Sequence, residues 1–409
     1  MSSPAQAPAP ASERAGYAVD VLRRLYPPPL QVGAASTAAA PVRARFLLLP
    51  TPGRPRLVVP AGHRRAAGRA VHRQLTGRRP RTRAARLLLR AAVASGLADR
   101  LPPGPLLVSG PSGADCVDRV LAGVLGRQGL LVSLPLSPPR ANRKPVLQVC
   151  DRAGRALAFV KVGHDPLTRR LVAAEGDSLE QLASAGLRGV RVPAVLARLA
   201  WNELDLLVLE PLPLSRRRLG GPVARTALLA AVREIAALGA SPATGWADSP
   251  YRPALAGQLA DCGAAAASLL GHLQALDATA PQLALGAWHG DLNPGNVALV
   301  EEQSLVWDWE RFEHGVPLGF DLLHHDLHRD VTMAQVPPPE AARRLLAAAA
   351  ATLAPLAVGP AEAEATARLY LLALAARYLR DRQSEAGGGL GSVETWLLPA
   401  LDAARRPAR

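Results

Sequence analysis

The chain has 409 residues, which is long enough to bury a sizeable core in two or three domains. Its 48 basic and 33 acidic side chains give a formal net charge of +15. The three cysteines show no C-x-x-C spacing, so they argue against a disulfide framework or a zinc site and favour a reducing, cytoplasmic compartment. They are Cys116, Cys150 and Cys262.

Neither a secretory leader nor a membrane span is expected. Residues 1–16 are rich in alanine, proline and serine and lack an apolar core, so they predict a disordered tail. The longest apolar run, residues 345–359, contains Pro355 and is shorter than the roughly 20 residues that cross a bilayer. It predicts a buried helix instead.

Residues 17–126 form a basic N-terminal region of unknown role. Residues 21–98 contain sixteen arginines and no acidic residue, so the rest of the chain is close to neutral. Such a segment suggests an anionic partner, but its few aromatic side chains offer no stacking platform for nucleic acid. A solvated, arginine-rich helical face is favoured over nucleic-acid binding.

Within this region, the residue pattern predicts strands at 44–50 and 55–62, joined by a Pro/Gly turn. One or two arginine-rich helices follow to about Leu97, with alanine and leucine on one face. A further strand at 104–110 and a helix at 114–126 complete it.

Residues 127–212 predict a strand-rich lobe. Its strands are expected at 129–137, 145–151, 155–163, 190–197 and 204–213, with an amphipathic helix at 167–186. Lys161 stands in one of the apolar strands, LAFVKVG, and only one other basic residue of the chain is a lysine. An ordinary surface cation in this composition would be arginine.

From residue 213 to 409 the composition becomes helical. Apolar residues recur at helical spacing in 226–240, 253–278, 339–357, 360–381 and 393–406. Strands therefore lie mostly before residue 210 and helices mostly after it, which predicts an α+β fold of two lobes.

The stretch from Trp288 to Asp321 carries the chemistry. His289, Asp291 and Asn296 fit H-x-D-x-x-x-x-N, the spacing of a kinase catalytic loop. In such a loop a carboxylate faces the substrate hydroxyl and the distant amide turns back toward a metal ion. Asp308 follows a short apolar strand, where it could supply a second oxygen ligand to Mg²⁺.

The motifs HGDLNPGN, VWDWE and GVPLGFD resemble those of the aminoglycoside phosphotransferase-like family of the protein-kinase-like superfamily. The resemblance implies a strand-rich small lobe, a helical large lobe, and Asp291 as the group that orients the hydroxyl and accepts its proton. Asn296 and Asp308 would hold Mg²⁺. His289 would pack beneath the loop, and Asp321 would support the loop backbone.

The same resemblance assigns nucleotide contacts to the small lobe. Lys161 would bind the α- and β-phosphates and pair with Glu175, with Glu180 as the other candidate. The backbone from Glu210 to Leu212 would hydrogen-bond the adenine. The loop at 137–144 contains no glycine, and its cations, Arg140, Arg143 and Lys144, either contact phosphate or are solvated.

The expected function is therefore Mg²⁺-dependent transfer of the γ-phosphoryl group of ATP, or of GTP, to a hydroxyl of a small molecule. A sugar, an aminoglycoside or an amino-alcohol could be the acceptor. The lack of an acidic cluster beyond the catalytic one favours a neutral sugar-like acceptor. The alternative is a catalytically inactive kinase-like module that docks an anionic partner through the basic region.

The motif LLHHDLHRD at 322–330 leaves three interpretations open. It places His324 and His328 four residues apart, a spacing that zinc sites use on helices. It could also shape the acceptor pocket, because it follows Asp321 directly. The simplest interpretation is the start of a helix with polar residues.

Overall fold

The computed structural model divides the chain into two compact units, each described here by itself. Unit 1 comprises residues 1–138, 143–169 and 195–211, and unit 2 comprises residues 139–142, 170–194 and 212–409. The described residues are 13–33, 40–74, 80–100, 104–137, 143–214, 218–277, 282–301, 303–381 and 393–405. Helices and β-sheets occur in both units, so the predicted α+β class is confirmed.

A nine-stranded sheet forms the centre of unit 1. Its strand order is β1-β4-β2-β3-β5-β6-β7-β10-β9, and every neighbouring pair is antiparallel. Valine and leucine dominate these strands because branched side chains pack well on a pleated surface. The strands are β1 (Gln31–Gly33), β2 (Val42–Leu49), β3 (Leu57–Pro60), β4 (Leu106–Ser109), β5 (Leu131–Pro135), β6 (Val146–Cys150), β7 (Ala156–Gly163), β9 (Val195–Trp201) and β10 (Leu204–Leu209).

The basic N-terminal region and the strand-rich segment after it share this sheet. β3 pairs with β5, and Val58 lies opposite Leu134. The turn between β6 and β7 also contacts helix α2 (Arg64–Gln74), since a Cβ on Gly154 would come within 2.9 Å of the Arg65 carbonyl oxygen. Gly154 has φ of +78°, so both the turn and the close approach require glycine. Nothing in the residue pattern had indicated that the two regions form one sheet.

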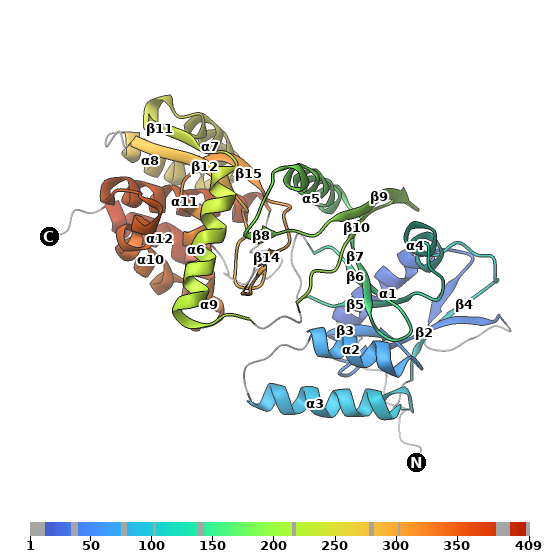
Figure 1. Cartoon of the computed structure of the whole chain (residues 1–409). Coiled ribbons are helices and arrows are strands. Elements are labelled where there is room, and N and C mark those ends of the chain that lie inside the picture. The colour runs from blue at the N-terminus through green and yellow to red at the C-terminus, as the bar shows by residue number, and fades with distance from the viewer. Residues whose placement is uncertain are drawn as a thin grey trace, which may run out of the picture. The chain divides into compact units, whose positions relative to one another are not determined.

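The helices α1 to α4 accompany the sheet in unit 1 (Figure 1). Helix α1 begins at Glu13, inside the segment 1–16 for which a disordered tail was expected; residues 1–12 lie outside the described residues. Leu22 and Leu25 of α1 are buried in the same core as the strands. The helices are α1 (Glu13–Leu25), α2, α3 (Pro80–Ser95) and α4 (Val117–Leu125), and a 3₁₀ turn η1 covers Ala98–Arg100.

The two arginine-rich helices differ in how they bury their apolar residues. On α2, Ala66 and Ala70 are buried while Arg65 is exposed, as expected for a helix with one solvated face. On α3, Leu87 and Leu88 are 60% and 72% exposed. The expectation that leucine lies on the inward face is therefore wrong for these two residues; among the described side chains of α3, Leu89, Ala92 and Val93 belong to the core.

A partly buried carboxylic acid in unit 1 predicts a pH-dependent stability. The Tyr26 hydroxyl donates a hydrogen bond of 2.9 Å to Asp118, and burial nevertheless raises the pKa of Asp118 to about 6. Because the folded-state pKa lies above the unfolded value, the contribution of Asp118 to stability is fully present below about pH 4. It is lost as pH rises through 6. Asp118→Asn, which keeps an acceptor but cannot ionise, should therefore be about 1–3 kcal/mol more stable than the wild type at pH 8.

Denaturant unfolding at pH 4 and pH 8 measures this difference. At pH 4 the variant and the wild type should be nearly equal. Asp20→Asn is the control, since Asp20 is exposed on α1, and it should show no such pH dependence. An advantage of Asp118→Asn that is the same at both pH values would show that the pKa of Asp118 is not raised.

Unit 2 combines helices with two small sheets. One sheet has the order β11-β12-β15 and the other β13-β14-β8. The strands are β8 (Val190–Arg191), β11 (Ser241–Gly245), β12 (Gln282–Trp288), β13 (Val297–Leu299), β14 (Ser304–Val306) and β15 (Glu313–Pro317). The short apolar strand expected before Asp308 is β14, which pairs antiparallel with β13 in a hairpin after the loop.

The helices of unit 2 follow the predicted apolar periodicity. They are α6 (Gly221–Ala237), α7 (Tyr251–Ala260), α8 (Ala266–Asp277), α9 (Phe320–Thr332), α10 (Pro338–Leu353), α11 (Pro360–Arg380) and α12 (Val393–Arg405), with 3₁₀ turns η2 (Trp246–Asp248), η3 (Gly263–Ala265) and η4 (Ala354–Leu356). Helix α5 (Pro166–Ser184) passes from unit 1 into unit 2 after Arg169. The ring of Phe320 packs at 5.3–5.8 Å from the rings of Tyr251, Trp288 and Tyr370, and so ties β12, α7, α9 and α11 together.

The length and apolar content of the described helices bear on whether the chain could span a membrane. None of them alone has the length and apolar content needed to cross one. Pro338–Leu356 and Pro360–Arg380 reach that length and composition only as a pair, across a bend of 117°.

Candidate active site

The predicted catalytic loop lies in unit 2 between β12 and β13. Its backbone turns tightly, because the N–H of Asn293 donates to the Asp291 carbonyl at 2.7 Å and the N–H of Asn296 donates to the Asn293 carbonyl at 3.0 Å. The side chain of Asn293 accepts a bond of 2.7 Å from the N–H of Gly295, a local turn that asparagine favours. Local hydrogen bonds thus fix the spacing from Asp291 to Asn296.

Asn296 turns back within the loop and contacts Asp291, whereas its expected contact with a metal ion stays a prediction. Its Nδ2 donates to both the carbonyl oxygen and the carboxylate Oδ2 of Asp291, each at 2.9 Å. The amide nitrogen is therefore used within the loop, and the amide oxygen is left as the atom that a cation would prefer. The structure brings these two predicted site residues together.

Gly290 sits at the tightest point of the loop. Its φ is +84°, and a Cβ there would lie 2.1 Å from the carbonyl oxygen of Arg311. Its own carbonyl accepts a hydrogen bond from the Arg377 guanidinium on α11. No other residue fits this position without movement of one of the two backbones.

Asp321 holds the start of the loop through two backbone bonds. Its Oδ2 accepts from the N–H of His289 at 2.7 Å and its Oδ1 from the N–H of Gly290 at 3.3 Å. Burial raises the pKa of Asp321 to about 7, although both bonds act in the opposite direction. The carboxylate is thus placed to support the loop backbone.

His289 packs under the loop as a neutral ring. Its Nδ1 accepts from the N–H of Asp291 at 3.1 Å, so Nε2 carries the proton and donates to the Trp307 carbonyl at 3.1 Å. The side chain is buried against Trp309 with 4.4 Å between ring centroids, and burial lowers the pKa of His289 to about 4. His289 therefore links the loop to the strand end that carries Asp308.

Asp308 belongs to a cluster of three carboxylates. Ligand oxygens of Glu175, Asp308 and Glu310 all lie within 4.8 Å of one another. Asp308 has φ of +74°, a conformation that few side chains adopt and that is concentrated at functional sites. Carboxylate oxygens are the ligands that Mg²⁺ prefers, so the donor set fits a hard divalent cation.

Glu310 is a site residue that sequence reasoning missed. It lies two residues after Asp308 in the motif VWDWE, which was used for its aspartate alone.

Glu175 was expected to contact nucleotide-binding Lys161. In unit 2 it is fully buried, and its Oε1 accepts a bond of 3.3 Å from the N–H of Trp309, beside the acidic cluster.

The remaining nucleotide contacts expected from the sequence lie partly in unit 1. Lys161 is buried on β7, where its backbone lies opposite Val146 and Leu207. Glu210 follows β10 at the end of that unit, whereas Leu212 lies in unit 2 beside the buried Ala298, Val300 and Leu305. Because the two units are described separately, the Lys161–Glu175 pair and the adenine contacts stay predictions.

The glycine-free loop at 137–144 falls largely outside the described residues, which omit 138–142 and with them Arg140. The guanidinium of Arg143 lies 3.5 Å from the centre of the Tyr17 ring. A cation held on an aromatic ring in this way has a structural partner within unit 1. Whether the loop covers phosphates stays a prediction.

The histidine motif at 322–330 forms part of α9, and one of its residues reaches Asp291. Nε2 of His324 lies 2.9 Å from Oδ1 of Asp291, and Nδ1 lies 3.0 Å from the hydroxyl of Tyr370. The rings of His324 and His328 stack with 4.2 Å between centroids. In the part of the chain that the structure describes, the acidic cluster is the only group of three or more His, Cys, Asp or Glu side chains placed to share a metal ion.

Asp291 is ionised in this environment. Burial opposes its charge, but the bond from His324 and the nearby charge of Arg377 together hold its pKa well below the usual range. Its side chain stays 31% exposed, so the carboxylate remains accessible. The arrangement can orient a hydroxyl group and accept its proton beside a cation site.

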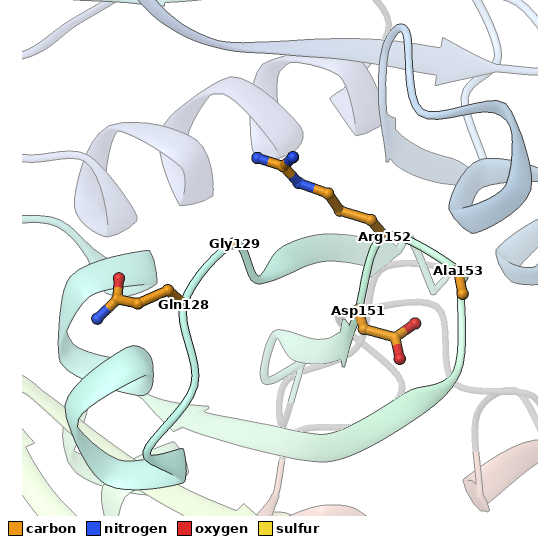
Figure 2. Close-up of a pocket in the computed structure, with 5 residues that line it drawn as sticks. All are labelled: Gln128, Gly129, Asp151, Arg152 and Ala153. Carbon is orange, nitrogen blue, oxygen red and sulfur yellow. The ribbon is translucent and has the colours of Figure 1, made fainter.

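A shallow pocket in unit 1 contains none of these residues. Figure 2 shows its lining, which comes from the segment before β5 and from the β6–β7 turn: Gln128, Gly129, Asp151, Arg152 and Ala153. Asp151 bonds to its own turn, accepting from the N–H and the Nε of Arg155 at 2.8 and 3.1 Å. The position of the Asp151 carboxylate in this pocket is therefore explained by the turn itself.

Comparison with known proteins relates part of the chain to one family. The phosphotransferase enzyme family matches residues 149–325, a segment that includes Lys161 and the catalytic loop. No curated protein matches the chain. Forty-seven chains of known structure do, and three of the most similar are described next.

A putative fructosamine-3-kinase from Haemophilus somnus 129PT shares 14% identity, covering 71% of this chain and 97% of that one, with a TM-score of 0.45. The aminoglycoside phosphotransferase APH(3'')-Id from Streptomyces rimosus, in complex with ADP and streptomycin, shares 17% identity over 57% of this chain and 90% of that one (TM-score 0.38). The spectinomycin phosphotransferase APH(9)-Ia, in complex with ADP and spectinomycin, shares 11% identity over 71% and 94%, respectively (TM-score 0.39).

The family match carries the relationship, since the three TM-scores lie below 0.5. It spans the loop motif HGDLNPGN, the strand motif VWDWE and Asp321, which are the residues that first suggested the resemblance. The match therefore confirms, over residues 149–325, that this chain is similar to the phosphotransferase enzyme family, as its motifs had suggested.

Proposed function

We propose that the protein is a phosphotransferase that moves the γ-phosphoryl group of ATP or GTP to a hydroxyl of a small molecule in the presence of Mg²⁺. One observation carries the proposal: an ionised Asp291 is bonded to Asn296 in a loop whose neighbouring strand ends in the acidic cluster around Asp308. An acid that accepts a proton and oxygens that bind a cation are the two parts that phosphoryl transfer requires.

In this proposal Asp291 orients the acceptor hydroxyl and takes its proton as the hydroxyl oxygen attacks the γ-phosphorus. The bond from that phosphorus to the bridging oxygen breaks, and the nucleoside diphosphate leaves. Asn296 and Asp308 would hold Mg²⁺, with Glu310 as a further carboxylate of the same cluster, and the ion would neutralise phosphate charge. Lys161, paired with Glu175, contacts the α- and β-phosphates, and the backbone from Glu210 to Leu212 contacts the base.

The first test is nucleotide binding, measured by thermal unfolding with ATP or GTP, with and without Mg²⁺. A nucleotide at 100 times its dissociation constant should stabilise the wild type by roughly 2.7 kcal/mol. Asp308→Asn should lose the part of this stabilisation that depends on Mg²⁺, because an amide is a weaker ligand than a carboxylate. Asparagine tolerates positive φ, so the backbone at this position should be kept.

Asp261→Asn is the matched control. Asp261 is exposed at the end of α7, and its substitution removes the same charge as Asp308→Asn does. It should respond to Mg²⁺ and nucleotide as the wild type does. If neither nucleotide stabilises the wild type with Mg²⁺, the phosphotransferase proposal fails. The catalytically inactive binding module, which docks an anionic partner through the basic region, would then be the better account.

A further inference from the structure

His324 makes two hydrogen bonds in a fully buried position on the second turn of α9. Its side chain has no exposed surface, whereas that of Asp291 is 31% exposed. One ring nitrogen lies 2.9 Å from Oδ1 of Asp291, and the other lies 3.0 Å from the hydroxyl of Tyr370 on α11. A buried ring with two such partners cannot rotate without losing both bonds.

The chemistry of the two partners fixes where the protons lie. An ionised Asp291 can only accept, so Nε2 of His324 carries a proton and donates it. Burial lowers the pKa of His324, which leaves the ring neutral and Nδ1 as an acceptor. Burial also raises the pKa of Tyr370, so its hydroxyl keeps the proton that it donates to Nδ1. The donors therefore run in one direction, from Tyr370 through His324 to Asp291.

Asp291 is held at both oxygens as a result. Oδ1 accepts from His324, and Oδ2 accepts from Asn296 at 2.9 Å. The bond from Asn296 comes from the loop itself, but the bond from His324 comes from a helix that starts 29 residues after Asp291. Each carboxylate oxygen keeps a further lone pair for a substrate hydroxyl, and the plane of the carboxylate is set by the two donors.

We propose that His324 is a positioning residue for Asp291, and that Tyr370, by donating to Nδ1, holds the ring in the orientation that can do this. The inference rests on the proposed phosphotransfer and adds to it two residues that lie outside the catalytic loop. His324 is fully buried, so it does not touch the acceptor and acts through Asp291 alone. Its bond fixes the carboxylate in the orientation that receives the proton, and small errors of orientation in such a group lower rates strongly.

Two amide variants of His324 test the direction of the bond. Glutamine can place an N–H near the position of Nε2, whereas asparagine is one methylene shorter and reaches only the region of Nδ1. The probe is hydrolysis of ATP or GTP with Mg²⁺ and no acceptor, in which water replaces the substrate hydroxyl. His324→Asn should reduce turnover about 10- to 100-fold. His324→Gln should stay close to the wild type, and both variants should bind the Mg²⁺ nucleotide as tightly as the wild type does.

The tautomer is tested without turnover, by ¹⁵N NMR of histidine-labelled protein, in which His324→Gln identifies the resonance. The wild type should show a neutral ring protonated on Nε2. Tyr370→Phe should keep this tautomer, which Asp291 fixes, but shift the Nδ1 resonance because the bond to Nδ1 is lost. Tyr251→Phe is the control, because Tyr251 is equally buried and also packs on Phe320 but is not bonded to His324. His272→Asn, at a buried histidine near Asp402, should leave turnover unchanged.

The outcomes separate the inference from the proposed function. If the wild type neither binds the Mg²⁺ nucleotide nor hydrolyses it, the proposed function fails and the positioning role falls with it. If the wild type turns over and His324→Asn matches it, the positioning role is wrong and the function stands. A wild-type ring that is protonated on Nδ1, or on both nitrogens, overturns the assignment of Tyr370 whatever the turnover is.

Discussion

Gly290→Ala should destabilise the protein by more than about 4 kcal/mol, near the upper limit for a single substitution. Positive φ alone costs a side chain about 1–2 kcal/mol. The larger part comes from the Cβ, which would lie 2.1 Å from the carbonyl oxygen of Arg311. The loop cannot move aside freely, because Asp321 binds the N–H of Gly290 and Arg377 binds its carbonyl. Denaturant unfolding measures the loss.

Gly315→Ala provides the matched control for this substitution. Gly315 has a similar φ of +71° in the same unit, but a Cβ there would meet no atom within 4 Å. It should lose only the conformational part, about 1–2 kcal/mol. Equal losses in the two variants would show that the contact with Arg311 can be relieved and that the loop is less constrained than its hydrogen bonds indicate.

Asp291→Asn should reduce nucleotide turnover by about 10²- to 10⁴-fold, the usual contribution of a positioned general base. Asparagine has nearly the same shape and can still accept the bond from His324, but its amide cannot take a proton from the acceptor. Binding of the Mg²⁺ nucleotide should therefore change little. The measurement combines turnover, with water or a candidate alcohol as acceptor, and nucleotide affinity from thermal unfolding.

Asp261→Asn again serves as the control and should keep full turnover. If Asp291→Asn were as active as the wild type, another group would have to receive the proton. A parallel loss of nucleotide affinity would point instead to a collapsed loop. The bonds from Asn296 to Asp291 make such a collapse visible as a lower unfolding midpoint.

The catalytic loop could be predicted from the sequence because its geometry is local. Asp291 and Asn296 are five residues apart, and the bonds that join them close within one turn. Asp308 follows a hairpin whose two strands are adjacent in the chain. Short loops restrict where such side chains can lie, so spacing alone carries most of the information.

The contacts of His324 could not be predicted in the same way. Asp291 and Tyr370 are 33 and 46 residues from it in the chain, and their meeting depends on how α9 and α11 pack. Alanine is abundant on α10 and α11, so many rotations of these helices would bury similar apolar faces. The motif LLHHDLHRD marked the right segment but not the partner.

The small sheet β11-β12-β15 of unit 2 was also missed. Strand β12 contains alanine, glycine and glutamine, which have weak strand preference, and it pairs with two strands that are distant in the chain. The segment 253–278 was expected to be helical throughout. It is divided into α7 and α8 near Gly263, whose φ of +59° ends the regular helix. Apolar periodicity continues across such a break and does not reveal it.

The shared sheet of unit 1 limits where the chain can be cut without exposing the edge of a strand. The family-matched segment begins at residue 149, inside β6, so it lacks β5 and every strand beyond it. A fragment cut there would expose a bare strand edge and lose the α2 helix against which Gly154 packs. We therefore expect that the family-matched segment does not fold by itself. A fragment that contains this segment would also need the strands and helices of the arginine-rich N-terminal region.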